Sequence, residues 1–287
     1  MEHQVIKFCH ISPTKFLPTY TARNGAHLIL AHLVESDPVY RDYYANLDDG
    51  LYKIMDNSAF EMFKLGRPMY DSAKLIEMGK ACKADCIVMT DYPKMHSSNT
   101  KNKAIEMLPY LKGEGFDTFF CPQSELGDID DLVSAFEWAL EHPSIDLIGM
   151  SILACPIGLG VNEGKFEDGG RDDAYKLQRF VSRFTVFDIL QRRGLLSDAR
   201  AQKRFHCLGM TDGPREISLL RPFHDNIFSW DSSAAVWAGM NSILFDGSST
   251  GLRNGKFEKE VEFHYDGPTN DLAVFHNIAY IDQLISA

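Results

Sequence analysis

The chain has 287 residues, of which 45% are hydrophobic, and a formal net charge of −11. One (β/α)8 barrel takes roughly 250 residues, so we expect a single domain over residues 1–287. No apolar run approaches the roughly 20 residues of a membrane span, and the first four residues lack a signal-peptide pattern. We therefore expect a soluble, cytoplasmic protein with no membrane partner, and any nucleic-acid binding must come from a local basic patch.

Eight short β-rich runs are predicted along the chain, and most are continuous apolar runs. Such runs are typical of parallel strands that are covered on both faces. The predicted strands are Val5–Cys9, His27–Leu33, Tyr52–Met55, Cys86–Thr90, Asp117–Phe120, Ile145–Met150, Phe205–Gly209 and Asn226–Trp230.

Amphipathic helices are predicted between the strands, so strand and helix alternate. The clearest are Asp71–Lys83, Lys101–Lys112, Asp128–Glu141, Asp172–Arg193 and Pro214–Leu220. An open doubly wound sheet would give the same alternation, but that fold usually has a glycine-rich turn after its first strand, and the segment from Cys9 to Pro13 contains no glycine. The pattern favours an α/β protein with a (β/α)8 barrel.

The connection from Ser151 to Arg204, between predicted strands six and seven, is unusually long. It contains glycines before its helix, as binding loops and lids often do. From Arg171 to Arg204 there are nine Lys or Arg and four Asp or Glu. This local excess of positive charge fits either an ordinary solvated helix or a surface that binds phosphates.

The six cysteines are scattered, and four of them lie in or beside predicted strands. A free thiol in that setting behaves as a small hydrophobic group. We therefore expect the cysteines to be buried and structural.

Several predicted strands end on polar residues, three of which are aspartates. Asp56, Asp91 and Asp231 follow strands three, four and eight, and Gln123 follows strand five. Catalytic groups of a (β/α)8 barrel lie at the carboxyl ends of its strands, so these side chains are predicted to converge. Asp231 could alternatively cap the helix predicted from Ala234 to Gly239.

These polar residues, in their order along the chain, resemble the motifs of the tRNA-guanine transglycosylase superfamily. The run from Asp56 to Phe60 looks like that family's Asp-Ser-Gly-Gly-Phe/Tyr motif, and Asp91, Gln123, the strand end at Gly149, Leu208 and Asp231 follow at similar spacing. The resemblance covers roughly residues 50–255. It implies a (β/α)8 barrel that exchanges guanine in a nucleic acid for a 7-deazaguanine base.

The resemblance also implies roles for individual residues. Asp231 takes the position of the nucleophile and Asp56 that of the general acid/base. Further residues take positions that contact the heterocycle: Asp91 and Gln123 by hydrogen bonds, Phe60 and Leu208 by stacking, and Asn57, Gly149, Met150, Ser151 and Gly209 beside them. A carboxylate can form a glycosyl ester with the sugar, a second can move the proton, and Asp with Gln can read the edge of a guanine.

The tRNA enzymes of this family have a zinc site after the nucleophile, with the pattern Cys-x-Cys-x2-Cys followed by His. This chain has no cysteine beyond Cys207, so we expect no metal and no cofactor. A short, zinc-less relative resembles the bacteriophage DNA transglycosylases, which insert preQ0-type bases into viral DNA as protection against restriction. The expected partners are then DNA and a free 7-deazaguanine base.

The phosphates of DNA are expected to contact basic residues of the long connection and of the segment after Asp231. These are Arg171, Lys176, Arg179, Arg183, Arg253 and Lys256. Two other classes of function stay open. One is a transglycosylase that acts on tRNA, and the other is a small-molecule enzyme or a silent binding module on the same barrel.

Overall fold

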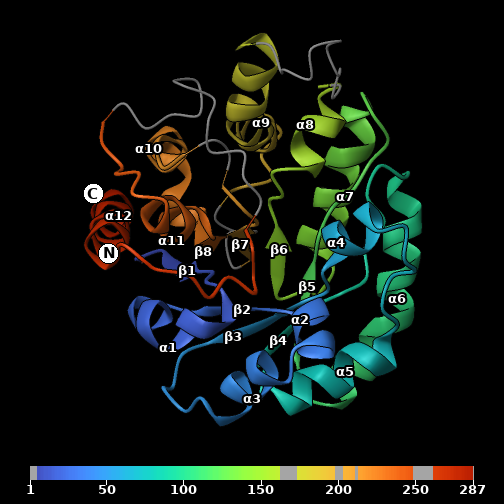
Figure 1. The fold of residues 1–287 in the computed structure, drawn as a ribbon. Coiled ribbons are helices and arrows are strands. Elements are labelled where there is room, and N and C mark those ends of the chain that lie inside the picture. The colour runs from blue at the N-terminus through green and yellow to red at the C-terminus, as the bar shows by residue number, and fades with distance from the viewer. Residues whose placement is uncertain (1–4, 162–172, 198–202, 211–212, 248–260, 287) are drawn as a thin grey trace.

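The structure, a computed structural model, describes residues 5–161, 173–197, 203–210, 213–247 and 261–286 (Figure 1). Eight parallel strands form one sheet in the order β1-β8-β7-β6-β5-β4-β3-β2. The strands are β1 Lys7–His10, β2 His27–Leu30, β3 Lys53–Asp56, β4 Cys86–Val88, β5 Asp117–Phe120, β6 Leu147–Gly149, β7 Arg204–Cys207 and β8 Ile227–Ser232. This is a (β/α)8 barrel, and all eight predicted strands are present.

The two ends of the sheet, β1 and β2, close the barrel through the loop that joins them. The Gly25 N–H donates to the Phe8 carbonyl at 2.9 Å, and the His10 N–H donates to Asn24 Oδ1 at 2.8 Å. A side chain at Gly25 would place its Cβ 3.0 Å from the Lys7 Cα, so only glycine allows this close approach.

Helices surround the strands (Figure 1). The α-helices are α1 Leu17–Tyr20, α2 Ala31–Ser36, α3 Pro38–Asn46, α4 Ala59–Lys64, α5 Ser72–Ala81, α6 Ser97–Gly113, α7 Ile129–Glu141, α8 Ala154–Gly158, α9 Asp173–Arg192, α10 Arg215–Leu219, α11 Ala234–Met240 and α12 Asp271–Ile285. Short 3-10 turns lie at Thr14–Phe16, Thr21–Arg23 and Arg221–Asn226. No helix of the described ranges is long and apolar enough to cross a bilayer.

The five clearest predicted helices correspond to α5, α6, α7, α9 and α10, and the helix predicted from Ala234 to Gly239 is α11. The long connection between strands six and seven contains α8 and α9. The predicted strand His27–Leu33 was too long, because the chain turns directly from Leu30 into α2. The C-terminal helix α12 was not predicted. It packs against α11, where Gly239 leaves room for the backbone of Val274.

The described cysteines are all free and buried, which confirms their structural role. Burial also raises the pKa of several of these thiols, Cys121 among them, so they stay protonated.

Candidate active site

One face of the strands can be identified as the barrel interior. The Tyr52 hydroxyl donates to Asp117 Oδ2 at 2.6 Å, although β4 lies between their strands. Side chains two residues apart share a face of a strand, so Ile54 and Asp56 lie on the same interior side as Tyr52. Asp56 is therefore an interior residue at the carboxyl end of β3, where barrel enzymes place their catalytic groups.

Asp231 lies inside β8, opposite Cys9 of β1, and its carboxylate is held from two sides. His206 Nε2 lies 2.9 Å from Asp231 Oδ1, and the Gly209 N–H donates to the same oxygen at 3.0 Å. The alternative that Asp231 caps α11 is wrong, since Ser232 Oγ accepts the Ala234 N–H there. Two donors on Oδ1 fix the carboxylate and orient Oδ2.

Asp56 is partly buried and accepts the Ser58 N–H at Oδ2, at 2.9 Å. Its pKa is raised well above the ordinary value, first by loss of solvation and then by the negative charges of Glu61, Asp231 and Asp91. Asn57, the residue after Asp56, contacts Asp91, so these two strand ends are neighbours. The raised pKa favours the protonated form of Asp56, as a general acid requires.

Asp91 is 3% exposed and is held by two side-chain amides. Asn57 Nδ2 donates to Asp91 Oδ1 at 2.7 Å, and Gln123 Nε2 donates to Oδ2 at 2.5 Å. Burial raises the pKa of Asp91 to about 6, and these two hydrogen bonds oppose that shift. Asp91 is therefore mostly ionised at pH 7 and can accept hydrogen bonds from a ligand.

The side-chain amides of Asn57 and Gln123 differ in which polar atoms can still contact a ligand. Asn57 also donates to the Met89 carbonyl and accepts the Ala59 N–H, so its amide is occupied in positioning Asp91 and starting α4. Gln123 Oε1, in contrast, is buried and has no hydrogen-bond partner within the described residues. An unpaired buried acceptor is costly, and a bound heterocycle with an N–H group would satisfy it.

Gly149 and Gly209 are required by packing at the candidate site. A Cβ on Gly149 would lie 2.8 Å from Phe119 Cε2 and 3.0 Å from Leu208 Cδ1. Gly209 has φ +70, and a Cβ there would lie 2.7 Å from Ile152 Cδ1. The Gly209 N–H holds Asp231, so this residue positions the carboxylate of Asp231 with its backbone.

Met150 and Ser151 have their polar groups occupied by the protein. The Met150 N–H donates to the His206 carbonyl, and its own carbonyl accepts from Leu208 N–H and Arg183 Nη1. Ser151 Oγ accepts the N–H groups of Leu153 and Ala154 at the start of α8. The hydrogen bonds assign both residues to the support of the site.

Phe60 and Leu208, the expected stacking pair, differ in exposure. Phe60 lies on the first turn of α4 and is 45% exposed. Leu208 is partly buried, directly after β7 and beside Gly149. The Phe60 ring is open to a ligand, as the stacking role requires.

Arg183 was predicted to contact nucleic acid, and the structure contradicts this. Arg183 is fully buried on α9, and its Nε and Nη2 donate to both carboxylate oxygens of Glu216 at 2.6 and 2.5 Å. Its guanidinium also lies 4.6 Å from the Trp230 ring. The charge pattern of the sequence does not distinguish such a buried ion pair from a surface patch.

The other predicted DNA contacts have mixed outcomes. Lys176 and Arg179 are partly exposed on α9, so they remain candidates. Arg171, Arg253 and Lys256 lie outside the described residues.

His206 is the site residue that sequence reasoning missed. It is fully buried, with Nδ1 2.7 Å from Ser229 Oγ and Nε2 on Asp231. The sequence could have indicated His206 by its position within a predicted strand, because a buried polar side chain there needs a hydrogen-bond partner in the interior.

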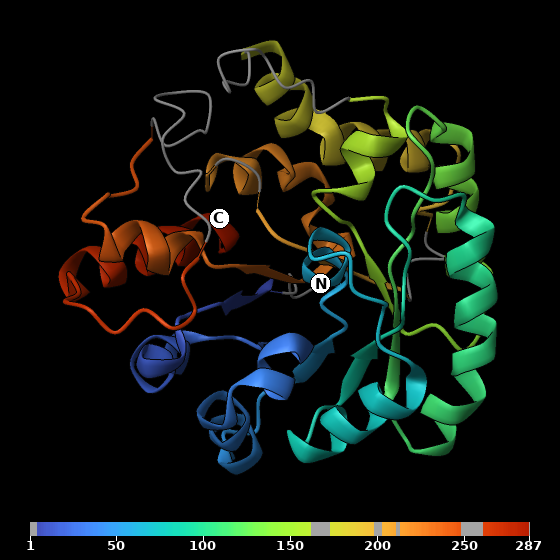
Figure 2. The same ribbon diagram turned by 45° about the vertical axis from the view of Figure 1, so that its right-hand side comes forward.

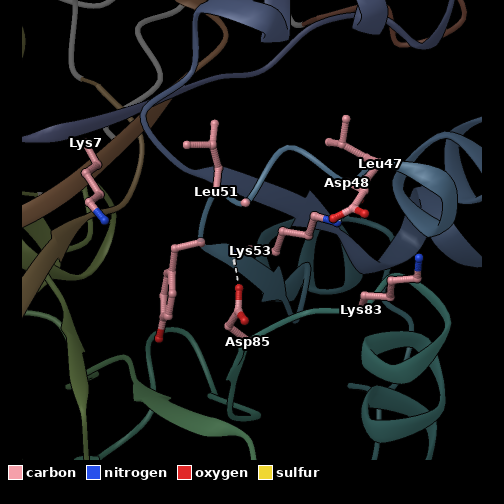
Figure 3. Close-up of a pocket in the computed structure, with 9 residues that line it drawn as sticks. Lys7, Leu47, Asp48, Leu51, Lys53, Lys83 and Asp85 are labelled. Carbon is pink, nitrogen blue, oxygen red and sulfur yellow. Dashed lines mark hydrogen bonds between the residues drawn. The ribbon is translucent and has the colours of Figure 1, made fainter.

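A separate pocket of about 400 Å³ lies at the other end of the strands (Figure 3). Lys7, Tyr52, Lys53 and Asp85 line it, and all of them lie at or before the amino ends of β1, β3 and β4. The Lys53 ammonium donates to the Leu47 carbonyl and the Lys53 N–H donates to Asp85. These groups hold the loops at the amino ends of the strands.

Within the described residues, no cluster of His, Cys, Asp or Glu could hold a metal ion.

Comparison with known proteins assigns no function to this chain. No family model matches this chain, and no curated protein matches its sequence. Among solved structures, a protein assigned as a fructose-1,6-biphosphate aldolase from Coccidioides immitis has 8% identity and a TM-score of 0.42, over 99% of this chain and 89% of that one. The protein CitE from Mycobacterium tuberculosis, in complex with magnesium and acetate, has 12% identity and a TM-score of 0.39, over 95% of this chain and 94% of that one.

A flavocytochrome b2 mutant has 10% identity and a TM-score of 0.40, over 99% of this chain and 66% of that chain. Likenesses of this size transfer no activity.

Proposed function

We propose that this protein is an enzyme, a DNA-guanine transglycosylase that exchanges a guanine base for a 7-deazaguanine. The observation that carries the proposal is the set of three aspartates at the carboxyl ends of β3, β4 and β8, each held in a different environment. Asp56 favours its protonated form, Asp91 is mostly ionised and held by two amides, and Asp231 is oriented by His206 and Gly209.

The proposed reaction has two displacements on one sugar carbon. In the first, Asp231 Oδ2 attacks the anomeric carbon, the bond to guanine breaks, and Asp56 gives its proton to the departing base. In the second, the incoming deazaguanine gives a proton to Asp56 and attacks the same carbon, which releases Asp231. Two inversions restore the original configuration, as in retaining glycosidases.

Recognition of the base is assigned to Asp91, Gln123 and Phe60. Ionised Asp91 can accept from the N1–H and the amino group of guanine, and the Gln123 amide can add a contact beside it. The half-exposed Phe60 can stack on the flat face of the base, which contributes about 1–3 kcal/mol.

The test is to incubate the protein separately with DNA and with tRNA, each with a panel of 7-deazaguanines, and to analyse the nucleosides by mass spectrometry. We expect a 7-deaza-2′-deoxyguanosine nucleoside from the DNA, together with release of guanine. Asp231→Asn should abolish exchange and still bind the free base, because an amide cannot form the glycosyl ester. Modification of tRNA in preference to DNA, or wild-type turnover by Asp231→Asn, would contradict the proposal.

A further inference from the structure

Exposed apolar side chains lie on and just after helix α4 and in the loop after β4, at the carboxyl end of the barrel. Phe63 on α4 is 46% exposed, Leu65 just after it is 65% exposed, and Met95 in the loop after β4 is 45% exposed. Helix α4 and the loop after β4 meet where Lys94 Nζ lies 5.6 Å from the centre of the Phe63 ring. We call Phe63, Leu65, Lys94 and Met95 the α4 platform.

The α4 platform begins at the candidate active site. Asp56 ends β3 and α4 starts three residues later, while Lys94 and Met95 follow Asp91 by three and four residues. Figure 2 shows the short helix α4 inside the ring of outer helices. Phe60 and Phe63 lie three residues apart on α4, so they lie on neighbouring positions of the helix surface. The platform therefore continues outward from the ring assigned to the target base.

The chemistry of the α4 platform suits unpaired nucleotides. An exposed ring offers a surface on which any base can stack, and a lysine beside it can contact the phosphate of the same nucleotide. The other charges of this segment balance, because Arg67 forms an ion pair with Glu35 and α4 carries both Glu61 and Lys64, which leaves Lys94 as the cation beside the Phe63 ring. In a chain of net charge −11, a lysine against an exposed ring favours an anionic, aromatic ligand over an apolar protein surface.

A single exposed apolar residue would need no explanation, since folded proteins commonly expose some. Here three exposed apolar residues, Phe63, Leu65 and Met95, lie on two adjoining segments. Lys94 lies beside them and has φ 63, a left-handed backbone conformation that lysine rarely adopts.

We propose that the α4 platform binds the nucleotides that flank the target guanine in single-stranded DNA, with a base stacked on Phe63 and its phosphate on Lys94. This inference rests on the proposed function and adds the place where the polymer lies. It also implies that the strand is unpaired beside the target, because bases within a duplex cannot reach the platform.

The experiment compares Phe63→Ala/Lys94→Gln with the control Tyr110→Ala/Lys80→Gln. The control removes an exposed aromatic ring and a lysine from the outer helices α6 and α5, where Lys80 pairs with Glu114. Each protein is titrated with a fluorescent single-stranded oligonucleotide containing one guanine, at several salt concentrations, and separately with free guanine.

We expect the platform variant to bind the oligonucleotide about 5- to 150-fold more weakly, the range given by loss of one stacked base. The slope of log Kd against log salt should fall by about 0.7, which corresponds to one phosphate contact on a single strand. Binding of free guanine and the melting temperature should stay at wild-type values, and the control should match the wild type. Phe63→Tyr should restore binding and Phe63→Leu should not.

Wild-type affinity and salt slope in the platform variant would overturn the proposal, even if the wild-type protein exchanges guanine in DNA. Loss of self-association by the platform variant, with oligonucleotide binding unchanged, would assign the surface to protein contacts instead. Failure of the proposed function has a different signature, namely no deazaguanine incorporated by the wild-type protein in the nucleoside assay.

Discussion

Asp56 is the residue whose proposed role depends most on its neighbours. Loss of solvation and the charges of Glu61, Asp231 and Asp91 all raise its pKa, which favours the protonated form that a general acid needs. Asp56→Asn should slow exchange by roughly 10²–10⁴-fold, the usual contribution of general acid/base catalysis. Single-turnover kinetics with a DNA substrate measures this rate, and DNA affinity is the control. An unchanged rate would assign the proton transfer to another residue.

His206 is expected to position Asp231. His206→Ala should lower kcat by about 10²-fold, since a small misplacement of a reacting group costs about this much. Affinity for free guanine should not change, because His206 is proposed to touch Asp231 and not the base. His206→Gln, whose amide can still donate to Oδ1, should recover part of the rate. If the affinity falls as much as kcat, the role of His206 is structural.

The strand-end aspartates and Gln123 were predictable from the sequence, because each follows an apolar run at the point where a barrel strand ends. The contacts that orient them were not predictable. His206, Asn57 and Gly209 each act on a residue distant in the chain, and the strand register decides those contacts.

At the scale of elements, α9 is joined to the barrel by Arg183. Its guanidinium pairs with Glu216 on α10 and also donates to the Met150 carbonyl, and it stacks on Trp230, the neighbour of Asp231. Helix α9 is therefore coupled to the carboxyl ends of β6 and β8. The sequence predicted this helix correctly and assigned its central arginine to the wrong environment.

Arg183→Ala should lower the free energy of unfolding by about 3–5 kcal/mol, because it leaves the Glu216 charge buried without its main partner. Urea denaturation measures the change. The control is Arg179→Ala on the same helix, where the side chain is partly exposed and the expected change is within about 0.5 kcal/mol. A change below about 1 kcal/mol for Arg183→Ala would show that the ion pair stabilises little.

At the scale of the whole molecule, holding Asp91 inside the barrel costs stability at neutral pH. Its pKa is about 6 in the folded protein, above the ordinary value of 3.8, so the folded state binds the proton more tightly than the unfolded state. This contribution to stability is fully present below pH 3.8 and is lost as pH rises through 6.

Asp91→Asn removes this titration. The stability of Asp91→Asn relative to the wild type should therefore rise by about 2–3 kcal/mol between pH 4 and pH 7.5, whatever the constant effect of the substitution. Urea denaturation of both proteins at several pH values gives this difference. A difference that does not vary with pH would show that the Asp91 pKa is not raised.

The sequence by itself determined the eight strands, the helices that match α5, α6, α7, α9, α10 and α11, and the catalytic candidates at strand ends, because hydrophobic periodicity and strand ends are local properties of the chain. Only the tertiary structure decided which side chains support those candidates, that Arg183 is buried, and that Phe63 and Lys94 share a surface beside them. Burial, strand register and contacts between separate loops depend on residues far apart in the chain, and no local pattern encodes them.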